Sequence, residues 1–231
     1  MNLQAHYNAM RRAAGQELAR GAAEIDKLID SPADSRRGIT LLARPPARLT
    51  AAIGKILADF RQIEPDQYFY PASDLHVTVL SIISCYPGFT LDLIAPAAYQ
   101  QALRAICQVS RPFTITYRGL TASAGGVMVQ GFPADGGLEE LRQATRRYFQ
   151  ASGLAQSIDQ RYCLQTAHST VIRFRQPLHN PAQLLAMLAR YEDHCFGSFE
   201  VDTVELVYND WYQRGRNTVL LEKSALGKGI V

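Results

Sequence analysis

The sequence lacks the patterns that mark several large classes of protein. No apolar run approaches the length needed to cross a bilayer, and no long run of basic residues suggests a nucleic-acid-binding tail. The cysteines Cys85, Cys107, Cys163 and Cys195 form no C-x-x-C pair, and no apolar secretory leader is present. We therefore expect a cytoplasmic protein with reduced thiols and no membrane partner.

Signatures of common cofactor and metal sites are also missing. The glycine pairs Gly125-Gly126 and Gly136-Gly137 fit neither a phosphate-binding loop nor a dinucleotide fingerprint, so they are interpreted as turns. His179 and His194 have no neighbouring acid or cysteine at a zinc-site spacing, and Cys163 has no histidine spaced for a thiol nucleophile. No cofactor and no metal is predicted.

What remains is an ordinary globular composition with a mild positive charge. The 231 residues are 47% apolar and 19% charged, which is enough for one sizeable core or two small lobes. The net charge of +3 permits an anionic substrate without requiring a nucleic acid.

Two short stretches with the same pattern stand out. Residues 75–80 (LHVTVL) and 167–172 (AHSTVI) each place a histidine two residues before a threonine within an apolar, β-branched run, which is typical of a buried strand. Because side chains alternate along a strand, His76 and Thr78 would share one face, and so would His168 and Thr170. Two such pairs suggest one site with two imidazoles and two hydroxyls.

The predicted elements repeat in order around these stretches. Each half reads strand, helix, histidine strand, helix, strand: 38–43, 49–60, 74–83, 95–109 and 113–117, then 127–131, 138–151, 163–174, 182–194 and 199–208. A helix over 3–29, ended by Ser31-Pro32, precedes the repeat, and a strand over 218–222 follows it.

The repeat predicts a single α+β domain over 1–231 made of two duplicated βαβαβ halves. We expect a helical extension at 1–37, one lobe at 38–120 and a second at 121–231, each a sheet with helices on one side and a free face that lines a cleft. Residues 121–126 are too few for a flexible linker between halves. Arginines in the first helix would also suit a transit peptide, but a solvated helix is the favoured interpretation.

Two histidines facing one cleft suit general acid–base catalysis, since an imidazole exchanges protons near neutral pH. The hydroxyls of Thr78 and Thr170 could then donate hydrogen bonds to a phosphate. Three alternatives remain: core histidines bonded to the adjacent threonines, a cleft that binds RNA ends or nucleotides without chemistry, or a metal or carbohydrate enzyme with histidine ligands.

The segment 70–80 (YPASDLHVTVL), together with 168–173 (HSTVIR), resembles the two-histidine (2H) phosphoesterase superfamily, which includes the 2′-5′ RNA ligase-like proteins and cyclic nucleotide phosphodiesterases. Val79 and Val171 match the apolar last position of its His-x-Thr/Ser-x motifs. The resemblance covers about 38–223. It implies two mainly antiparallel sheets forming a V-shaped cleft with helices outside, and metal-free hydrolysis of a 2′,3′-cyclic phosphate at an RNA end or in a nucleotide, with no obligatory protein partner.

The resemblance also implies a substrate-binding role for Arg173, which matches an arginine that often follows the second motif and could bind a phosphate. Strict alternation places it on the face opposite His168, so a bulge would be needed to turn it inward. Ser169, at a usually apolar position, and Ser84-Cys85, in place of an aliphatic-glycine ending, depart from the family pattern and leave the substrate open.

Aromatic residues near the motifs are further candidates. Tyr70 is predicted to contact substrate, and it belongs to a group that could either stack on a base or pack in the core: Tyr68, Tyr70, Tyr162, Tyr208 and Trp211.

Overall fold

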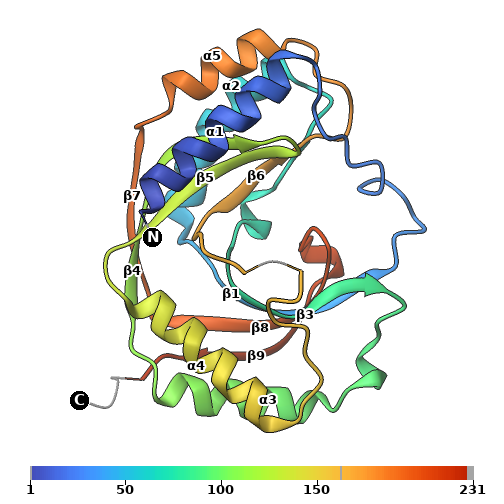
Figure 1. The fold of residues 1–231 in the computed structure, drawn as a ribbon, viewed down its shortest axis with the longest axis vertical. Coiled ribbons are helices and arrows are strands. Elements are labelled where there is room, and N and C mark those ends of the chain that lie inside the picture. Colours follow the sequence, from blue (N-terminus) through green and yellow to red (C-terminus); the bar gives the residue numbers. More distant parts are fainter. Residues whose placement is uncertain (1, 162, 228–231) are drawn as a thin grey trace.

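The computed structural model describes residues 2–161 and 163–227 and has the predicted α+β architecture of two antiparallel sheets with helices outside (Figure 1). The sheets have strand orders β3-β1-β8-β9, here named sheet A, and β2-β6-β5-β4-β7, named sheet B. The strands are β1 (Arg36–Ala43), β2 (Tyr68–Phe69), β3 (Val77–Pro87), β4 (Phe113–Ser123), β5 (Gly126–Pro133), β6 (Ser169–Arg173), β7 (Cys195–Val201), β8 (Thr203–Asp210) and β9 (Val219–Ala225).

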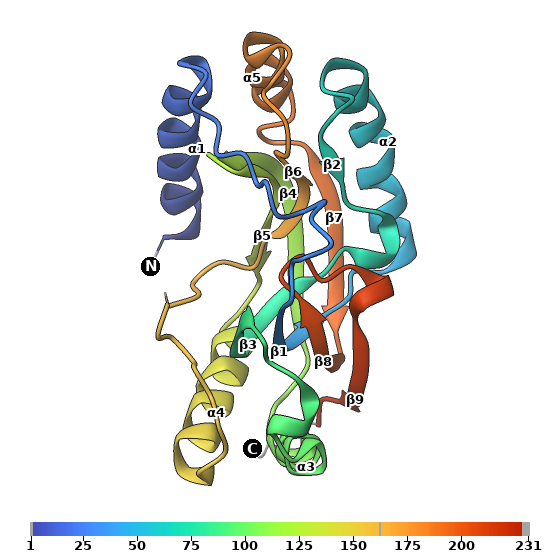
Figure 2. The same cartoon turned by 90° about the vertical axis from the view of Figure 1, so that its right-hand side faces the viewer.

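The helices form two groups at opposite ends of the molecule (Figure 2). They are α1 (Leu3–Ala19), α2 (Ala47–Ile63), α3 (Pro96–Gln108), α4 (Gly137–Ser152) and α5 (Pro181–Arg190). Helices α1, α2 and α5 contact strands of sheet B, whereas α3 contacts β9 and α4 contacts β3 of sheet A. No helix in the described ranges is long and apolar enough to cross a membrane.

The repeated order of elements is confirmed, but the boundary between lobes is not where the sequence placed it. β1-α2-β3-α3-β4 is followed by β5-α4-β6-α5-β7, as predicted. However, β4 runs through residue 120 and pairs with β5 in sheet B, while β8 pairs with β1 in sheet A. The two-residue turn after β4 places it beside β5. Because of this local pairing, β4, the last strand of the first half, belongs to the sheet of the second lobe.

The strand predicted over 199–208 is two strands. β7 ends at Val201 in sheet B, and β8 begins at Thr203 in sheet A. Phe199 and Val201 are buried, and the next buried residue is Val204, so the alternation changes phase at the break. A continuous strand would have exposed one of these apolar sets.

The first helix is shorter than the prediction and is part of the fold. It ends at Ala19 and is followed by Gly21 at φ +73°, a left-handed conformation that stops the helix well before Ser31-Pro32. The buried Tyr7 of α1 donates its hydroxyl to the carbonyl of Gly131 in β5 at 3.2 Å. Helix α1 therefore covers sheet B rather than standing apart as an extension.

Candidate active site

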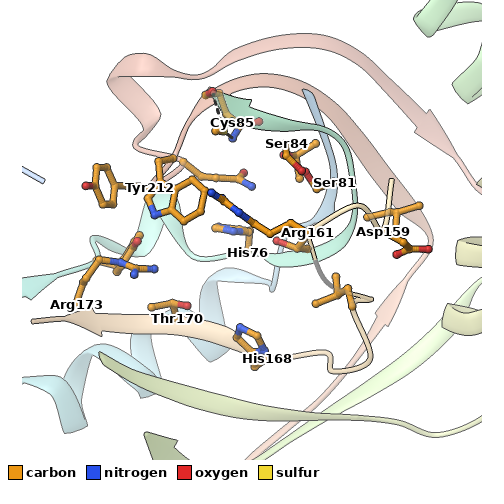
Figure 3. Close-up of a pocket in the computed structure, with 18 residues that line it drawn as sticks. His76, Ser81, Ser84, Cys85, Asp159, Arg161, His168, Thr170, Arg173 and Tyr212 are labelled. Atoms are coloured by element: carbon orange, nitrogen blue, oxygen red, sulfur yellow. Dashed lines mark hydrogen bonds between the residues drawn. The ribbon is translucent and has the colours of Figure 1, made fainter. Parts of the chain in front are cut away.

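The two His-x-Thr motifs occupy equivalent places in the two sheets. His76 immediately precedes β3, and His168 immediately precedes β6. Their imidazoles line one cavity between the sheets, together with the side chains of Thr78 and Thr170 (Figure 3). The structure thus brings together the four residues that the sequence singled out.

Each imidazole is held through its Nδ1 atom. His76 Nδ1 lies 2.7 Å from the carbonyl oxygen of Asp74, which can only accept, so Nδ1 carries the hydrogen and Nε2 of the neutral ring has a free lone pair. His168 Nδ1 lies 2.7 Å from Thr166 Oγ1, a hydroxyl that can donate or accept. This contact is compatible with either tautomer of His168, including the one that carries the hydrogen on Nε2.

Both imidazoles lie in an environment that disfavours a positive charge. Burial lowers the pKa of His76 to about 4, and the nearby Arg44 adds to this effect. Burial also lowers the pKa of His168 to about 4, with further contributions from His76, Arg142 and Arg173. A phosphodiester bound between the rings would act in the opposite direction, because an anion favours the imidazolium form.

Arg173 reaches the cavity because β6 contains a bulge, as the prediction for this residue required. Two neighbouring residues of β5 lie opposite Thr170 and Ile172, so Val171 is an extra residue in β6 and forms a bulge. The bulge reverses the alternation, and Arg173 lines the cavity beside Thr170 (Figure 3). Its buried Nε–H has no hydrogen-bond partner within the described residues, so a small shift of the guanidinium would offer this donor to an anion in the cavity.

Tyr70 lies next to Arg173 and contacts its side chain. It also lines the cavity, and its backbone N–H donates to the carbonyl of Val171 at the bulge, at 3.0 Å. Burial raises the pKa of Tyr70, although a hydrogen bond with Arg173 opposes the rise. The neutral hydroxyl is therefore placed to orient the guanidinium.

Ser169, the departure from the family pattern, links the two motifs directly. Its hydroxyl donates to the carbonyl oxygen of His76 at 2.5 Å and accepts from the Tyr117 hydroxyl at 2.5 Å. Ser169 and Tyr117 are fully buried. An apolar residue at this position could not make the connection, so this chain fixes one motif against the other with a hydroxyl.

Replacing Ser169 with alanine should lower the free energy of unfolding by about 1–3 kcal/mol, because the His76 carbonyl and the Tyr117 hydroxyl lose a buried partner. Denaturant titration measures the change. Ser198→Ala, which removes an exposed hydroxyl bonded to Thr116, is the matched control and should change stability by no more than about 0.5 kcal/mol. Equal effects of the two substitutions would contradict the role of the buried link.

Arg142 of α4 joins the backbones of both motifs. Its Nε donates to the Val79 carbonyl at 2.9 Å, and one terminal nitrogen donates to the carbonyls of Thr166 at 2.6 Å and Thr78 at 3.3 Å. Arg142 is 2% exposed, and burial lowers its pKa to about 10. One buried cation therefore ties the strand after His76 to the residue that holds His168.

The remaining aromatic candidates divide into packing residues and cavity residues. Tyr68 packs edge-on against Tyr70 with ring centroids 5.0 Å apart, and Tyr208 donates its hydroxyl to the Phe89 carbonyl at 3.1 Å. Trp211 lines the cavity. Tyr162 lies outside the described residues.

Among the residues that the structure describes, the other reactive side chains do not form a competing site. Within the ranges that the structure describes, no group of three or more His, Cys, Asp or Glu is placed to hold a metal ion. His179 is exposed and contacts Asp66, and His194 packs against Phe196. Cys85 lines the cavity, but burial raises the pKa of its thiol to about 12, so it is protonated near neutral pH.

Sequence reasoning missed several residues of the site. Arg142 follows Leu138 by one helical turn on the buried stripe of α4, and that placement of an arginine was the available signal. Arg161, Asn209 and Gln213 also line the cavity, but they come from irregular segments or a strand end where no pattern marks them.

Comparison with known proteins shows which solved structures share this fold. No protein-family model and no curated protein matches the chain. Among solved structures, E. coli LigT complexed with 3′-AMP has 18% identity, covers 83% of this chain and 98% of its own, and superposes with a TM-score of 0.56. The protein TT0787 of Thermus thermophilus has 17% identity, with coverages of 85% and 100% and a TM-score of 0.54.

A conserved protein of unknown function from Agrobacterium tumefaciens, ATU0111, superposes with a TM-score of 0.60 at 14% identity, over 89% of this chain and 97% of its own. A further neighbour is described only as a phosphoesterase, at 17% identity and a TM-score of 0.53. The chain thus has the bilobal fold of a phosphoesterase. More particularly, it has the fold of LigT, in agreement with the two-histidine resemblance seen in its sequence.

Proposed function

We propose that this protein is a metal-independent phosphodiesterase that hydrolyses 2′,3′-cyclic phosphates of RNA ends or nucleotides. The observation that carries the proposal is the convergence of His76, Thr78, His168 and Thr170 on one cavity. LigT, a fold neighbour, binds 3′-AMP, a nucleotide with a phosphate on a ribose hydroxyl.

In the proposed reaction a water attacks the phosphorus and the bond to one ribose oxygen breaks, giving a phosphomonoester. His76 suits the base, because its Nδ1–H donates to Asp74 and leaves Nε2 to take the proton of the water. His168 suits the acid, because its contact with Thr166 allows Nε2 to carry the proton that the leaving oxygen receives.

The remaining residues would bind the phosphate. The hydroxyls of Thr78 and Thr170 and the unpartnered Nε–H of Arg173 can donate to its non-bridging oxygens, where charge builds in the transition state. Tyr70 would hold the guanidinium in place. Such donors lower the barrier without a metal.

One observation favours the alternative of a binding module. With pKa values of about 4, both imidazoles are neutral near pH 7 in the free protein, so no proton donor is ready before substrate binds. The deciding experiment follows adenosine 2′,3′-cyclic phosphate by ³¹P NMR, with and without a chelator. Conversion to a phosphomonoester that chelation leaves unchanged supports the hydrolase, whereas binding without conversion supports the module. Activity that chelation abolishes would instead favour a metal enzyme.

The pH dependence of the reaction follows from the lowered pKa values. The active free enzyme needs one protonated and one neutral imidazole, so kcat/KM should be greatest at about pH 4 and should fall steeply as the pH rises toward neutrality. The optimum of kcat should lie at higher pH, since a bound phosphodiester raises the pKa of the acid. Initial rates across the pH range measure both profiles, and a kcat/KM that stays constant from about pH 5 to 8 would contradict this assignment.

A further inference from the structure

Trp211 is the only tryptophan of the chain, and two guanidinium groups lie close to its ring. It follows β8 and lines the cavity. The central carbon of the Arg36 guanidinium lies 4.8 Å from the ring centroid, and that of Arg161 lies 4.6 Å away. Indole is the preferred aromatic partner for a cation or a flat conjugated group.

The two guanidiniums are held very differently. Arg36 donates to both carboxylate oxygens of Asp34 at 2.8 Å and to the Tyr212 hydroxyl at 2.9 Å, so it is fixed in place. Arg161 is exposed, and within the described residues its guanidinium contacts the Trp211 ring without a hydrogen bond or an ion pair. Of the two, only Arg161 lines the cavity (Figure 3). The indole therefore has beside it, in the same cavity, a guanidinium that no described hydrogen bond holds and that a ligand could displace.

Hydrogen bonds hold the segment that carries Trp211. The carboxylate of Asp210 accepts from the backbone N–H groups of Tyr212 at 3.1 Å and Arg214 at 3.0 Å, and from the Arg214 side chain at 2.6 Å. Asp210 is 1% exposed. A ligand that stacks on Trp211 would therefore meet a surface that needs little reordering.

Two buried acceptors flank the tryptophan in the same cavity. Asn209 is 2% and Gln213 is 7% exposed, and the side-chain oxygen of each lacks a hydrogen-bond partner in the described part of the chain. A buried acceptor without a donor is costly, so rotation of either amide toward the cavity to meet an N–H group of a ligand would be favoured. Flat ligands that carry N–H donors at their edge include the amino-bearing nucleobases.

We propose that Trp211, Asn209 and Gln213 form a nucleobase subsite for bases with an amino group, and that Arg161 covers its stacking face when the subsite is empty. The inference rests on the proposed function for the position of the phosphate, which would lie between the two imidazoles while the base stacks on the indole. It names the substrate class as a nucleotide recognised through its base, rather than any cyclic phosphodiester.

The first test uses the fluorescence of the single tryptophan. Titration with 3′-AMP should change the emission of Trp211 in a saturable manner, and inorganic phosphate at the same concentrations should leave it unchanged. An equal response to the two ligands, or no response to 3′-AMP at a concentration that NMR shows to be saturating, would overturn the subsite.

The second test is kinetic. The protein should prefer adenosine 2′,3′-cyclic phosphate to the base-free 1-O-methylribose analogue, and Trp211→Ala should reduce that preference by about tenfold to hundredfold. Trp211→Phe should retain most of it. Tyr86→Ala, which removes an exposed aromatic that does not line the cavity, should leave the preference unchanged. Purine riboside 2′,3′-cyclic phosphate, which lacks only the amino group, should be a poorer substrate than the adenosine compound by about tenfold.

Failure of the subsite and failure of the proposed function give different results. A fluorescence response to 3′-AMP without hydrolysis of any cyclic phosphate would remove the enzyme and keep the base subsite. Equal hydrolysis of the nucleotide and the base-free analogue would keep the enzyme and overturn the subsite.

Discussion

Replacing either His76 or His168 with alanine should lower kcat on a 2′,3′-cyclic nucleotide by about 10²–10⁴-fold, the usual contribution of one positioned proton-transfer group. The double substitution should be little worse than the more damaging single one, because the two imidazoles act on the same transition state. Both side chains line the cavity, so their truncation enlarges an existing cavity and the fold should survive it. Single-turnover rates measure the loss of catalysis, and circular dichroism checks that the fold is retained.

A substrate with a good leaving group separates the two roles. A phosphodiester of p-nitrophenol needs no proton on its leaving oxygen, so His168→Ala should keep much of its activity on that compound, whereas His76→Ala should not. His179→Ala is the control, since His179 is exposed and contacts Asp66 away from the cavity. Parental rates for both alanine variants on a cyclic nucleotide would show that the motif histidines are not catalytic.

The second large effect is expected at Arg142. Arg142→Leu should lower the free energy of unfolding by at least about 3 kcal/mol, because it leaves three carbonyl oxygens of the motif backbones without their buried donor. Arg142→Lys keeps the charge but has no planar fork to reach all three, so it should recover only part of the loss. Arg147→Leu on the exposed side of the same helix should change stability by no more than about 0.5 kcal/mol.

Arg142 should also influence the chemistry in a way that loss of stability alone would not. Its positive charge helps to lower the pKa of His168, so that pKa should rise in Arg142→Leu and stay low in Arg142→Lys. NMR signals of the imidazoles, followed against pH at a temperature where the variant is folded, measure the pKa of His168. An unchanged pKa of His168 in a folded Arg142→Leu protein would contradict the electrostatic part of this role.

The sequence predicts those features of the fold that arise from local patterns. Alternation located the first motif strand to within a few residues, and helical stripes did the same for α2, α3, α4 and α5. The second motif strand, predicted over 163–174, is confirmed only in its last part, because β6 begins at Ser169. The partner of each strand could not be predicted in this way. Apolar alternation shows that a strand such as β4 has a buried face, but not which sheet supplies its neighbour.

The same limit applies to the site. A histidine two residues before a threonine is visible in one segment, and its second copy made it informative. The bulge at Val171 that turns Arg173 inward depends on the register with β5, and no local pattern encodes it. The serine at position 169 has no explanation in its local sequence, because the groups that its hydroxyl contacts, the His76 carbonyl and Tyr117, lie far away in the sequence.

The pairing of β1 with β8 has a consequence for how the chain folds. β1 is synthesised long before β8, its partner in sheet A, because most of the described chain lies between them. Until β8 emerges, one edge of β1 has open backbone donors and acceptors, which is a risk for aggregation. Such non-local pairing slows folding, and it means that the His76 side of the cavity cannot be completed by an N-terminal fragment. We therefore expect the cavity to form late and as a unit, when β8 pairs with β1.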